Sequence, residues 1–303
     1  MADRGMRGGT RKLWPALALP GILWMALLLV APFYVVLAIL FGGVDPILRQ
    51  PVPVWNPYYW NFAQFEYVWE HIVGPDAFFR PALVRTVVYV GVSSLLCLLI
   101  AYPVAYYTAR FAGRWKGLLL AALIAPFWIS YMMRMLAWVN LLQTEGLVNR
   151  ALGVGGLFEV DVNWLGGRPE TVILGLAYGY VPYMILPLFA GLDRMPAATL
   201  EAARDLGANR WETFRRVTWP LSRQAVVASV LVTSVPMLGD YFTNDLLSGS
   251  PDTSMIGNLI NNSVHTPGQT GQAGAFVLLI LLVSILPMVV YVRYTRSAED
   301  IAS

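Results

Sequence analysis

The sequence predicts an all-α, polytopic membrane protein with six transmembrane helices. Of its 303 residues, 57% are hydrophobic and only 13% are charged, whereas a soluble domain carries about 25% charged residues. The apolar residues also gather in long blocks, which a globular core does not need. Helices are expected for these blocks because an open sheet leaves backbone groups without hydrogen bonds in lipid.

Six blocks are long enough to cross a bilayer, since about 20 helical residues span its roughly 30 Å hydrocarbon core. The first block follows four basic residues, as in a signal peptide, but it is longer than such a peptide's apolar part and lacks a clear cleavage site. We therefore expect it to be retained as a span. The predicted spans are residues 14–41, 82–108, 117–142, 171–191, 223–246 and 273–292.

Basic residues predict the orientation of these spans. Fifteen of the 21 lysines and arginines lie in the N-terminal segment, in the loops at 109–116 and 192–223, or in the C-terminal tail. Cytoplasmic loops of membrane proteins are enriched in these residues. Both termini are therefore expected in the cytoplasm.

The sequence lacks the residues that several kinds of site require. Cys97 is the single cysteine and the two histidines, His71 and His265, stand alone, so we expect no internal disulfide and no metal site. A phosphate-binding loop needs Gly-Lys-Ser/Thr, but Lys12 and Lys116 are followed by leucine and glycine. The spans hold no histidine, which disfavours a membrane enzyme, and no catalytic residue is assigned.

A charged segment, EAARDLGANRWETFRRVTWPL, occupies residues 201–221 between the fourth and fifth spans. Asp193 is expected to cap a helix with Pro196 in its first turn. Leu200, Ala203 and Leu206 would lie near one face of this helix, and Gly207 suits a left-handed C-terminal cap.

A second helix is expected from Asn209, with a bend at Pro220 into the fifth span. The residues alone leave two interpretations of the segment. It is either an amphipathic helix on lipid head groups or an element that docks a partner.

The segment resembles the EAA signature of permease subunits in ATP-binding-cassette (ABC) importers. The residues that match this signature are Glu201, Ala202, Ala203, Asp205, Gly207, Ala208, Phe214, Pro220 and Leu221. The resemblance implies the type I importer permease (MetI-like) fold, with one permease domain over residues 1–303. It also implies a cytoplasmic coupling helix at about 194–208, where Glu201 to Ala208 engage a separate ATPase.

The same resemblance implies partners and a location. Two ABC ATPase subunits would bind ATP and Mg²⁺, a second, related permease would complete the pathway, and an extracytoplasmic substrate-binding protein would deliver the cargo. The chain itself would hold no cofactor, would contact membrane lipid and would bind no nucleic acid. It would lie in the bacterial inner (plasma) membrane and work by alternating access.

Three further segments are similar to spermidine/putrescine permeases, and they imply a polyamine cargo. They are PFWISYMMRMLAW (126–138), LGDYFTNDLLSG (238–249) and SMIGNLI (254–260). Permeases for other small organic ions share parts of these segments, so that cargo class stays open. A secondary transporter driven by an ion gradient is a further alternative, although it would normally show more spans and repeat symmetry.

Acidic and aromatic residues near the outer end of the fifth span are candidates for binding such a cargo. Asp240 and Asp245 lie beside Tyr241 and Phe242, and an acid with aromatic faces suits an organic ammonium. Alternatively, Asp240 neutralises Arg134 within the membrane. Other aromatic side chains that could line the pathway are Trp128, Tyr131, Tyr178, Tyr180 and Tyr183.

Two outer loops have expected structures. The loop at 42–80 is rich in tryptophan and tyrosine, and it is either an interfacial aromatic belt or a small cap that contacts a soluble partner. The loop after the fifth span combines turn residues with the apolar run MIGNLI, which favours a short helix that lies at the outer surface or dips into the protein.

Overall fold

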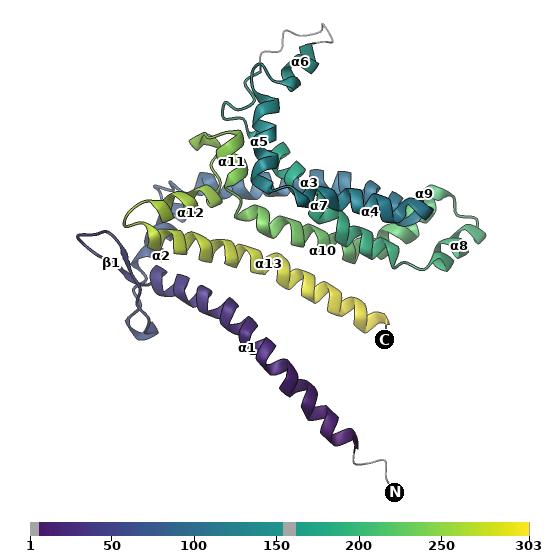
Figure 1. Cartoon of the computed structure of the whole chain (residues 1–303), viewed down its shortest axis with the longest axis horizontal. Coiled ribbons are helices and arrows are strands. Elements are labelled where there is room, and N and C mark those ends of the chain that lie inside the picture. Colours follow the sequence, from purple (N-terminus) through teal and green to yellow (C-terminus); the bar gives the residue numbers. More distant parts are fainter. Residues whose placement is uncertain (1–5, 154–161, 303) are drawn as a thin grey trace. The chain divides into compact units, whose positions relative to one another are not determined.

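The computed structural model describes residues 6–153 and 162–302, and helices dominate it (Figure 1). Five of the described helices are long and apolar enough to cross a membrane, and a sixth crossing is reached if one bent helix pair counts as a span. This confirms the all-α membrane fold. By contacts the chain divides into two compact units, Met1–Asp76 with Asn262–Val277, and Ala77–Asn261 with Leu278–Ser303. The single permease domain stays a prediction.

The first unit contains the N-terminal helix and the aromatic loop. Helix α1 (Met6–Leu40) leads into a two-stranded antiparallel hairpin, β1 (Gly43–Val44) and β2 (Pro51–Val52), then the 3₁₀ helix η1 (Pro57–Tyr59) and α2 (Ala63–Val73).

Aromatic packing and a capped turn fold this loop. The Phe41 ring centre lies 4.8 Å from that of Trp60 and 4.7 Å from that of Phe62. In the hairpin turn, the backbone N–H groups of Leu48 and Ile47 donate to the Asp45 carboxylate, and these hydrogen bonds lower the pKa of Asp45. The loop is thus folded, and both interpretations of it, the aromatic belt and the cap that contacts a partner, stay predictions.

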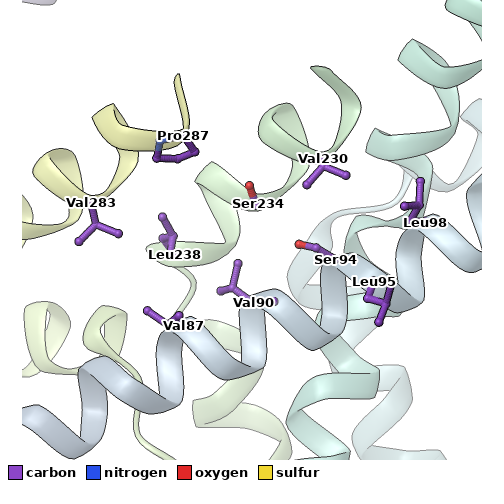
Figure 2. A pocket seen from close by; sticks show the side chains of 11 residues that line it. Val87, Val90, Ser94, Leu95, Leu98, Val230, Ser234, Leu238, Val283 and Pro287 are labelled. Atoms are coloured by element: carbon purple, nitrogen blue, oxygen red, sulfur yellow. The ribbon is translucent and has the colours of Figure 1, made fainter. Parts of the chain in front are cut away.

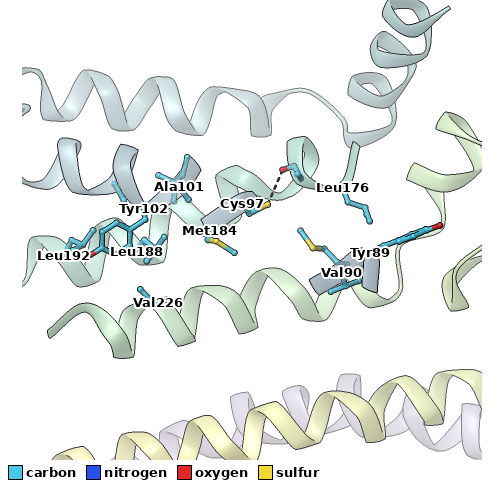
Figure 3. Packing of buried hydrophobic residues seen from close by; sticks show 14 of the residues in the cluster. Tyr89, Val90, Cys97, Ala101, Tyr102, Leu176, Met184, Leu188, Leu192 and Val226 are labelled. Atoms are coloured by element: carbon cyan, nitrogen blue, oxygen red, sulfur yellow. Dashed lines mark hydrogen bonds between the residues drawn. The ribbon is translucent and has the colours of Figure 1, made fainter. Parts of the chain in front are cut away.

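Three helices form the core of the second unit: α3 (Arg80–Arg110), α7 (Pro169–Asp193) and α10 (Trp219–Leu238). Figure 3 shows side chains from them meeting in one apolar cluster. Hydroxyl and thiol groups find backbone acceptors there, since Ser93 Oγ donates to Ile173 O at 3.0 Å and Cys97 Sγ to Ala177 O at 3.3 Å. Buried members of the cluster include Tyr89, Cys97, Ala101, Leu176, Met184, Leu188 and Leu192.

Helix α7 approaches its neighbours closely because it carries glycines at the contacts. A β-carbon on Gly191 would collide with the β-carbon of Ala225 in α10, and one on Gly175 would collide with Leu247. A β-carbon on Gly179 would lie 2.6 Å from the Tyr131 ring. Gly175 and Gly179 form a G-x-x-x-G pattern, which allows close helix packing in membranes. The sequence analysis overlooked this pattern.

The third predicted span, 117–142, is not one continuous helix. It is divided into α4 (Lys116–Ile124), the 3₁₀ helix η3 (Ala125–Trp128) and α5 (Tyr131–Leu142), followed by α6 (Leu147–Gly153), and the two halves meet at 85°. Pro126 cannot donate a helical hydrogen bond, and Ile129 adopts an extended conformation (φ −101°, ψ 131°). The sequence did not predict this break, because the residues on both sides of it are apolar.

The fifth predicted span, 223–246, ends earlier than expected. Helix α10 stops at Leu238 with Gly239 at its C-cap and Pro236 in its last turn. The short helices α11 (Phe242–Leu247), η5 (Pro251–Thr253) and α12 (Ile256–His265) follow, before α13 (Thr270–Ala302). The expected short helix in this loop is confirmed by α12. The placement of Asp240 and Asp245 within a spanning helix was wrong, because both lie beyond its end.

The glycine contact between α7 and α10 can be tested by adding one methyl group. Gly191→Ala should lower stability by about 1–3 kcal/mol, because overpacking forces backbone shifts. Gly117→Ala is a matched control, since nothing lies within 4 Å of an added β-carbon there, and it should gain up to about 1 kcal/mol from helix propensity. Thermal unfolding in detergent micelles would compare the two variants, and equal melting temperatures would contradict the close contact.

Candidate functional site

The charged segment forms a short helix at one end of the second unit, at the opposite end from α11 (Figure 1). After α7 ends at Asp193, helix α8 runs over Ala197–Asp205. The chain then enters α9 (Arg210–Thr213), which continues through the π-helical η4 (Phe214–Thr218) into α10. The helix expected at about 194–208 is therefore present but shorter.

The left-handed cap predicted at Gly207 is confirmed, and the second helix begins where it was expected, with Asn209 as its N-cap residue. Gly207 has φ +85°, and the N–H groups of Gly207 and Ala208 donate to the carbonyls of Arg204 and Ala203 at 2.8 and 3.1 Å. Asn209 and Glu212 form a reciprocal capping box with distances of 2.9 and 3.0 Å. Glycine is favoured at Gly207 because other residues resist this conformation.

Two details of the predicted start and face of α8 were wrong. Asp193 does not cap α8; Pro196 is the N-cap residue, and Asp193 instead pairs with Lys116 Nζ at 2.6 Å. Leu206 does not share the face of Leu200 and Ala203, because it lies beyond the last helical turn and is 89% exposed.

The outward face of α8 is small and acidic. Ala198, Glu201, Ala202 and Asp205 are exposed, whereas Leu200 and Ala203 of the same helix are half-buried. Small side chains let another surface approach closely, and the two carboxylates lie one turn apart. Ala208, beyond the cap, is half-buried. This face is suited to contact with a protein surface that carries basic groups.

Specific contacts join the α8 segment to the spanning helices. Arg110, at the end of α3, donates through Nη2 to the carbonyls of Leu192 and Met195 at 2.8 and 3.1 Å. Tyr102 OH lies 2.9 Å from Ser222 Oγ, and the Tyr102 ring contacts Phe214 with centroids 5.9 Å apart. The segments on either side of α8 are therefore tied to α3, α7 and α10.

A second candidate site surrounds Asp240, which is only 7% exposed. Its carboxylate accepts hydrogen bonds from Tyr131 OH at 2.7 Å, from the N–H of Thr243 at 3.0 Å and from Thr243 Oγ1 at 2.9 Å. These donors come from α5 and α11. In this conformation Asp240 ties the broken span to the end of α10, and little of its carboxylate is open to a cargo.

Arg134 and Asp240 form no ion pair in the part of the chain that the structure describes. Arg134 is 7% exposed, its guanidinium lies 5.4 Å from the ring centre of Tyr131, and its Nε is buried without a hydrogen-bond partner. Tyr131 therefore contacts both charges, with its hydroxyl on Asp240 and its ring beside Arg134. Direct neutralisation of one by the other is not seen.

Asp245 is more accessible than Asp240. Its side chain is exposed, its Oδ1 accepts from Asn258 Nδ2 at 2.6 Å, and Asn258 also holds the Tyr241 carbonyl at 3.2 Å. The Tyr241 and Phe242 rings stack with centroids 4.2 Å apart. An exposed carboxylate beside stacked rings can attract an organic cation.

The remaining predicted pathway residues separate into two groups. Tyr131, Tyr180 and Tyr183 form a chain of rings, with 5.7 Å between successive centroids. Trp128 is 82% exposed, and Tyr178 packs against Trp138 at 5.2 Å instead.

The groove of about 410 Å³ between α3, α10 and α13 is a poor site for a charged cargo. Figure 2 shows its aliphatic lining, in which Ser94 and Ser234 supply the hydroxyl groups. Within residues 6–153 and 162–302, no cluster of three or more histidine, cysteine or acidic side chains could hold a metal ion.

The membrane helices, one of them broken, and the short exposed helix α8 fit the membrane component of a transport system. The chain belongs to the family of binding-protein-dependent transport system inner membrane components, whose match covers residues 99–299. This membership fits a transport protein rather than an enzyme.

Curated relatives are named as permeases. The chain is 34% identical over 169 residues to the spermidine/putrescine transport system permease protein PotB of Escherichia coli (strain K12), a match over 56% of this chain and 61% of that protein. The corresponding protein of Salmonella typhimurium (strain LT2) gives the same identity, with 58% of its length matched. The match thus spans about three-fifths of these relatives. The inner membrane ABC transporter permease protein YdcU of Escherichia coli (strain K12) is 32% identical over 218 residues, covering 67% of this chain and 69% of that protein.

Solved structures confirm the type I importer permease fold. A chain of a bacterial alginate ABC transporter, in complex with its alginate pentasaccharide-bound periplasmic protein, aligns with a TM-score of 0.67 and 18% identity over 98% of both chains. A chain of the inward-facing MetNI methionine ABC transporter aligns with a TM-score of 0.55 and 16% identity, over 71% of this chain and 94% of that one. At these identities the likeness concerns the fold alone.

The hydrogen bond from Tyr131 to Asp240 can be tested by removing one hydroxyl. Tyr131→Phe should lower stability by about 1.5–3 kcal/mol, because a buried carboxylate loses a donor. Tyr183→Phe serves as the control, since the described structure shows no hydrogen bond to that hydroxyl. Thermal unfolding in detergent would compare the stability of the two variants. If Tyr131→Phe and Tyr183→Phe lowered stability equally, the hydrogen bond from Tyr131 to Asp240 would have no special role.

Proposed function

We propose that this chain is the permease subunit of an ATP-driven ABC importer and forms part of the membrane pathway for polyamines such as spermidine and putrescine. The observation that carries the proposal is the Gly207-capped helix α8, which presents Glu201, Ala202 and Asp205 of the EAA pattern on an exposed face. The names of the PotB relatives support the cargo class.

In this proposal α8 is the coupling helix. A separate ATPase subunit, which binds ATP and Mg²⁺, holds the face formed by Ala198, Glu201, Ala202 and Asp205. Its closure moves α8, and the contacts of Arg110 and Tyr102 pass that movement to α3, α7 and α10. The sites for nucleotide are supplied by the partner, because this chain carries no Gly-Lys-Ser/Thr sequence.

The complete transporter would contain two ATPase subunits, a second, related permease and an extracytoplasmic substrate-binding protein. The distribution of basic residues favours cytoplasmic termini and a cytoplasmic α8. The opposite end of the second unit, with α11 and α12, then faces the side from which the binding protein delivers cargo.

Cargo recognition is proposed at Asp245 rather than at Asp240. A polyamine carries several ammonium groups, and an ammonium gains from both a carboxylate and an aromatic face. Asp245 offers an exposed carboxylate next to Tyr241 and Phe242, while Asp240 is occupied by its hydrogen bonds to Tyr131 and Thr243. Tyr183 and Trp128 remain candidates for lining the pathway.

Gly207 provides a test of coupling. Gly207→Val should reduce uptake of labelled putrescine to background, because valine resists the left-handed conformation and disturbs the cap of α8. Gly207→Asn should retain uptake, since asparagine tolerates this conformation. Both variants must reach the membrane in equal amounts. Normal uptake by the valine variant would refute the coupling role.

Asp245 provides a test of cargo charge. Asp245→Asn should raise the KM for putrescine and spermidine by about three- to tenfold through loss of the ion pair. Asp252→Asn is the matched control, because Asp252 is an exposed acid of the neighbouring helix η5. Transport kinetics in cells with the complete importer would measure both. If a different small organic ion is carried and polyamines are ignored, the cargo assignment fails while the importer class stands.

A further inference from the structure

A pocket of about 340 Å³ lies behind α8, where α8 and α9 meet the end of α3. Tyr106, Phe111 and Phe214 provide aromatic walls, Leu200 adds an aliphatic side chain, and Arg204 and Arg210, both exposed, also line the pocket. Leu200 and Arg204 lie one turn apart on the pocket side of α8. The acidic face proposed to dock the ATPase is a different side of the same helix.

Neither arginine is neutralised within the described residues. The ion pair found there joins Lys116 to Asp193, and no hydrogen bond involves the guanidinium of Arg204 or Arg210. The nearby acid Glu212 is already engaged by the backbone N–H of Asn209 at 3.0 Å. The pocket therefore combines an apolar wall with two positive charges that lack an anion.

The position of the pocket indicates which anion is at hand. It lies at the level where the spanning helix α3 ends at Arg110 and where the helix that continues into α10 begins. Trp115 and Trp219, near the same helix ends, are 57% and 36% exposed, and tryptophan is enriched at membrane–water interfaces. Phospholipid phosphates occupy this depth, and basic pockets between spanning helices bind anionic head groups.

We propose that this pocket binds the phosphodiester head group of an anionic phospholipid. Arg204 and Arg210 would pair with the phosphate oxygens, because the planar guanidinium group can donate two hydrogen bonds to a phosphate at once. The apolar part of the lipid would lie along exposed residues of α3 and its end, such as Tyr107 and Phe111. A lipid held in this way bridges α8, α9 and α3, and its binding does not require α8 to engage an ATPase.

The test uses the purified full-length chain in a neutral detergent. Native mass spectrometry would measure binding of dioctanoyl phosphatidylglycerol, with dioctanoyl phosphatidylcholine and inorganic phosphate as separate probes. Each guanidinium is expected to contribute roughly fivefold to affinity, so Arg204→Gln/Arg210→Gln should weaken phosphatidylglycerol binding at least about tenfold. Arg215→Gln/Arg216→Gln removes the same charge from exposed positions outside the pocket and should leave binding within about twofold.

Three results would overturn the proposal. Equal weakening by both double variants would mean that general basic charge, rather than the pocket, attracts the lipid. Equal binding of phosphatidylcholine would remove the preference for an anion. Competition by inorganic phosphate at the same concentration as the lipid would reassign the pocket to a free anion. The double variant Arg204→Lys/Arg210→Lys keeps the charge. If it retains lipid binding while Arg204→Gln/Arg210→Gln loses it, charge is required and misfolding does not explain the loss of binding.

Discussion

The close packing around α7 is the constraint on which the second unit depends. Three glycines on one helix each admit a different neighbour: Gly175 faces Leu247 of α11, Gly179 faces the Tyr131 ring of α5, and Gly191 faces Ala225 of α10. Lipid tails are as apolar as the helices, so association in a membrane depends on packing and hydrogen bonds rather than on the hydrophobic effect. Helix α7 is therefore the element through which the broken span, the outer turn and the α10 helix are held together.

The polar contacts at the two ends of α7 have different characters. Near α8, Arg110 and the pair of Lys116 with Asp193 fasten helix ends, and these groups are partly accessible to solvent. Around Asp240, Thr243 is buried, Tyr131 is half-buried and the carboxylate is almost enclosed. A surface ion pair contributes about 0–1 kcal/mol, whereas leaving a buried polar group unpaired costs more. The end at α8 is accordingly the easier one to displace, which suits a segment proposed to move.

The sequence analysis succeeded where a local signal decided the structure. Gly207 acts through its own backbone, so composition and spacing were sufficient for this cap and for the start of the second helix near Asn209. It failed where tertiary packing decided. Hydropathy is blind to the break after Pro126, because both halves are equally apolar, and it extended the fifth span past Gly239. The pairing of Arg134 with Asp240 was plausible on charge alone. In the structure, the Tyr131 hydroxyl donates to Asp240 and the Tyr131 ring lies beside Arg134, and the sequence does not show this arrangement.

The burial of Cys97 has a practical consequence. Its thiol lies inside the α3–α7–α10 core and bonds to the Ala177 carbonyl, so a water-soluble maleimide has no route to it in the folded protein. The native chain is thus already a silent background for site-directed labelling. A cysteine introduced on any exposed element would be the one labelled, and Cys97 would not first have to be replaced.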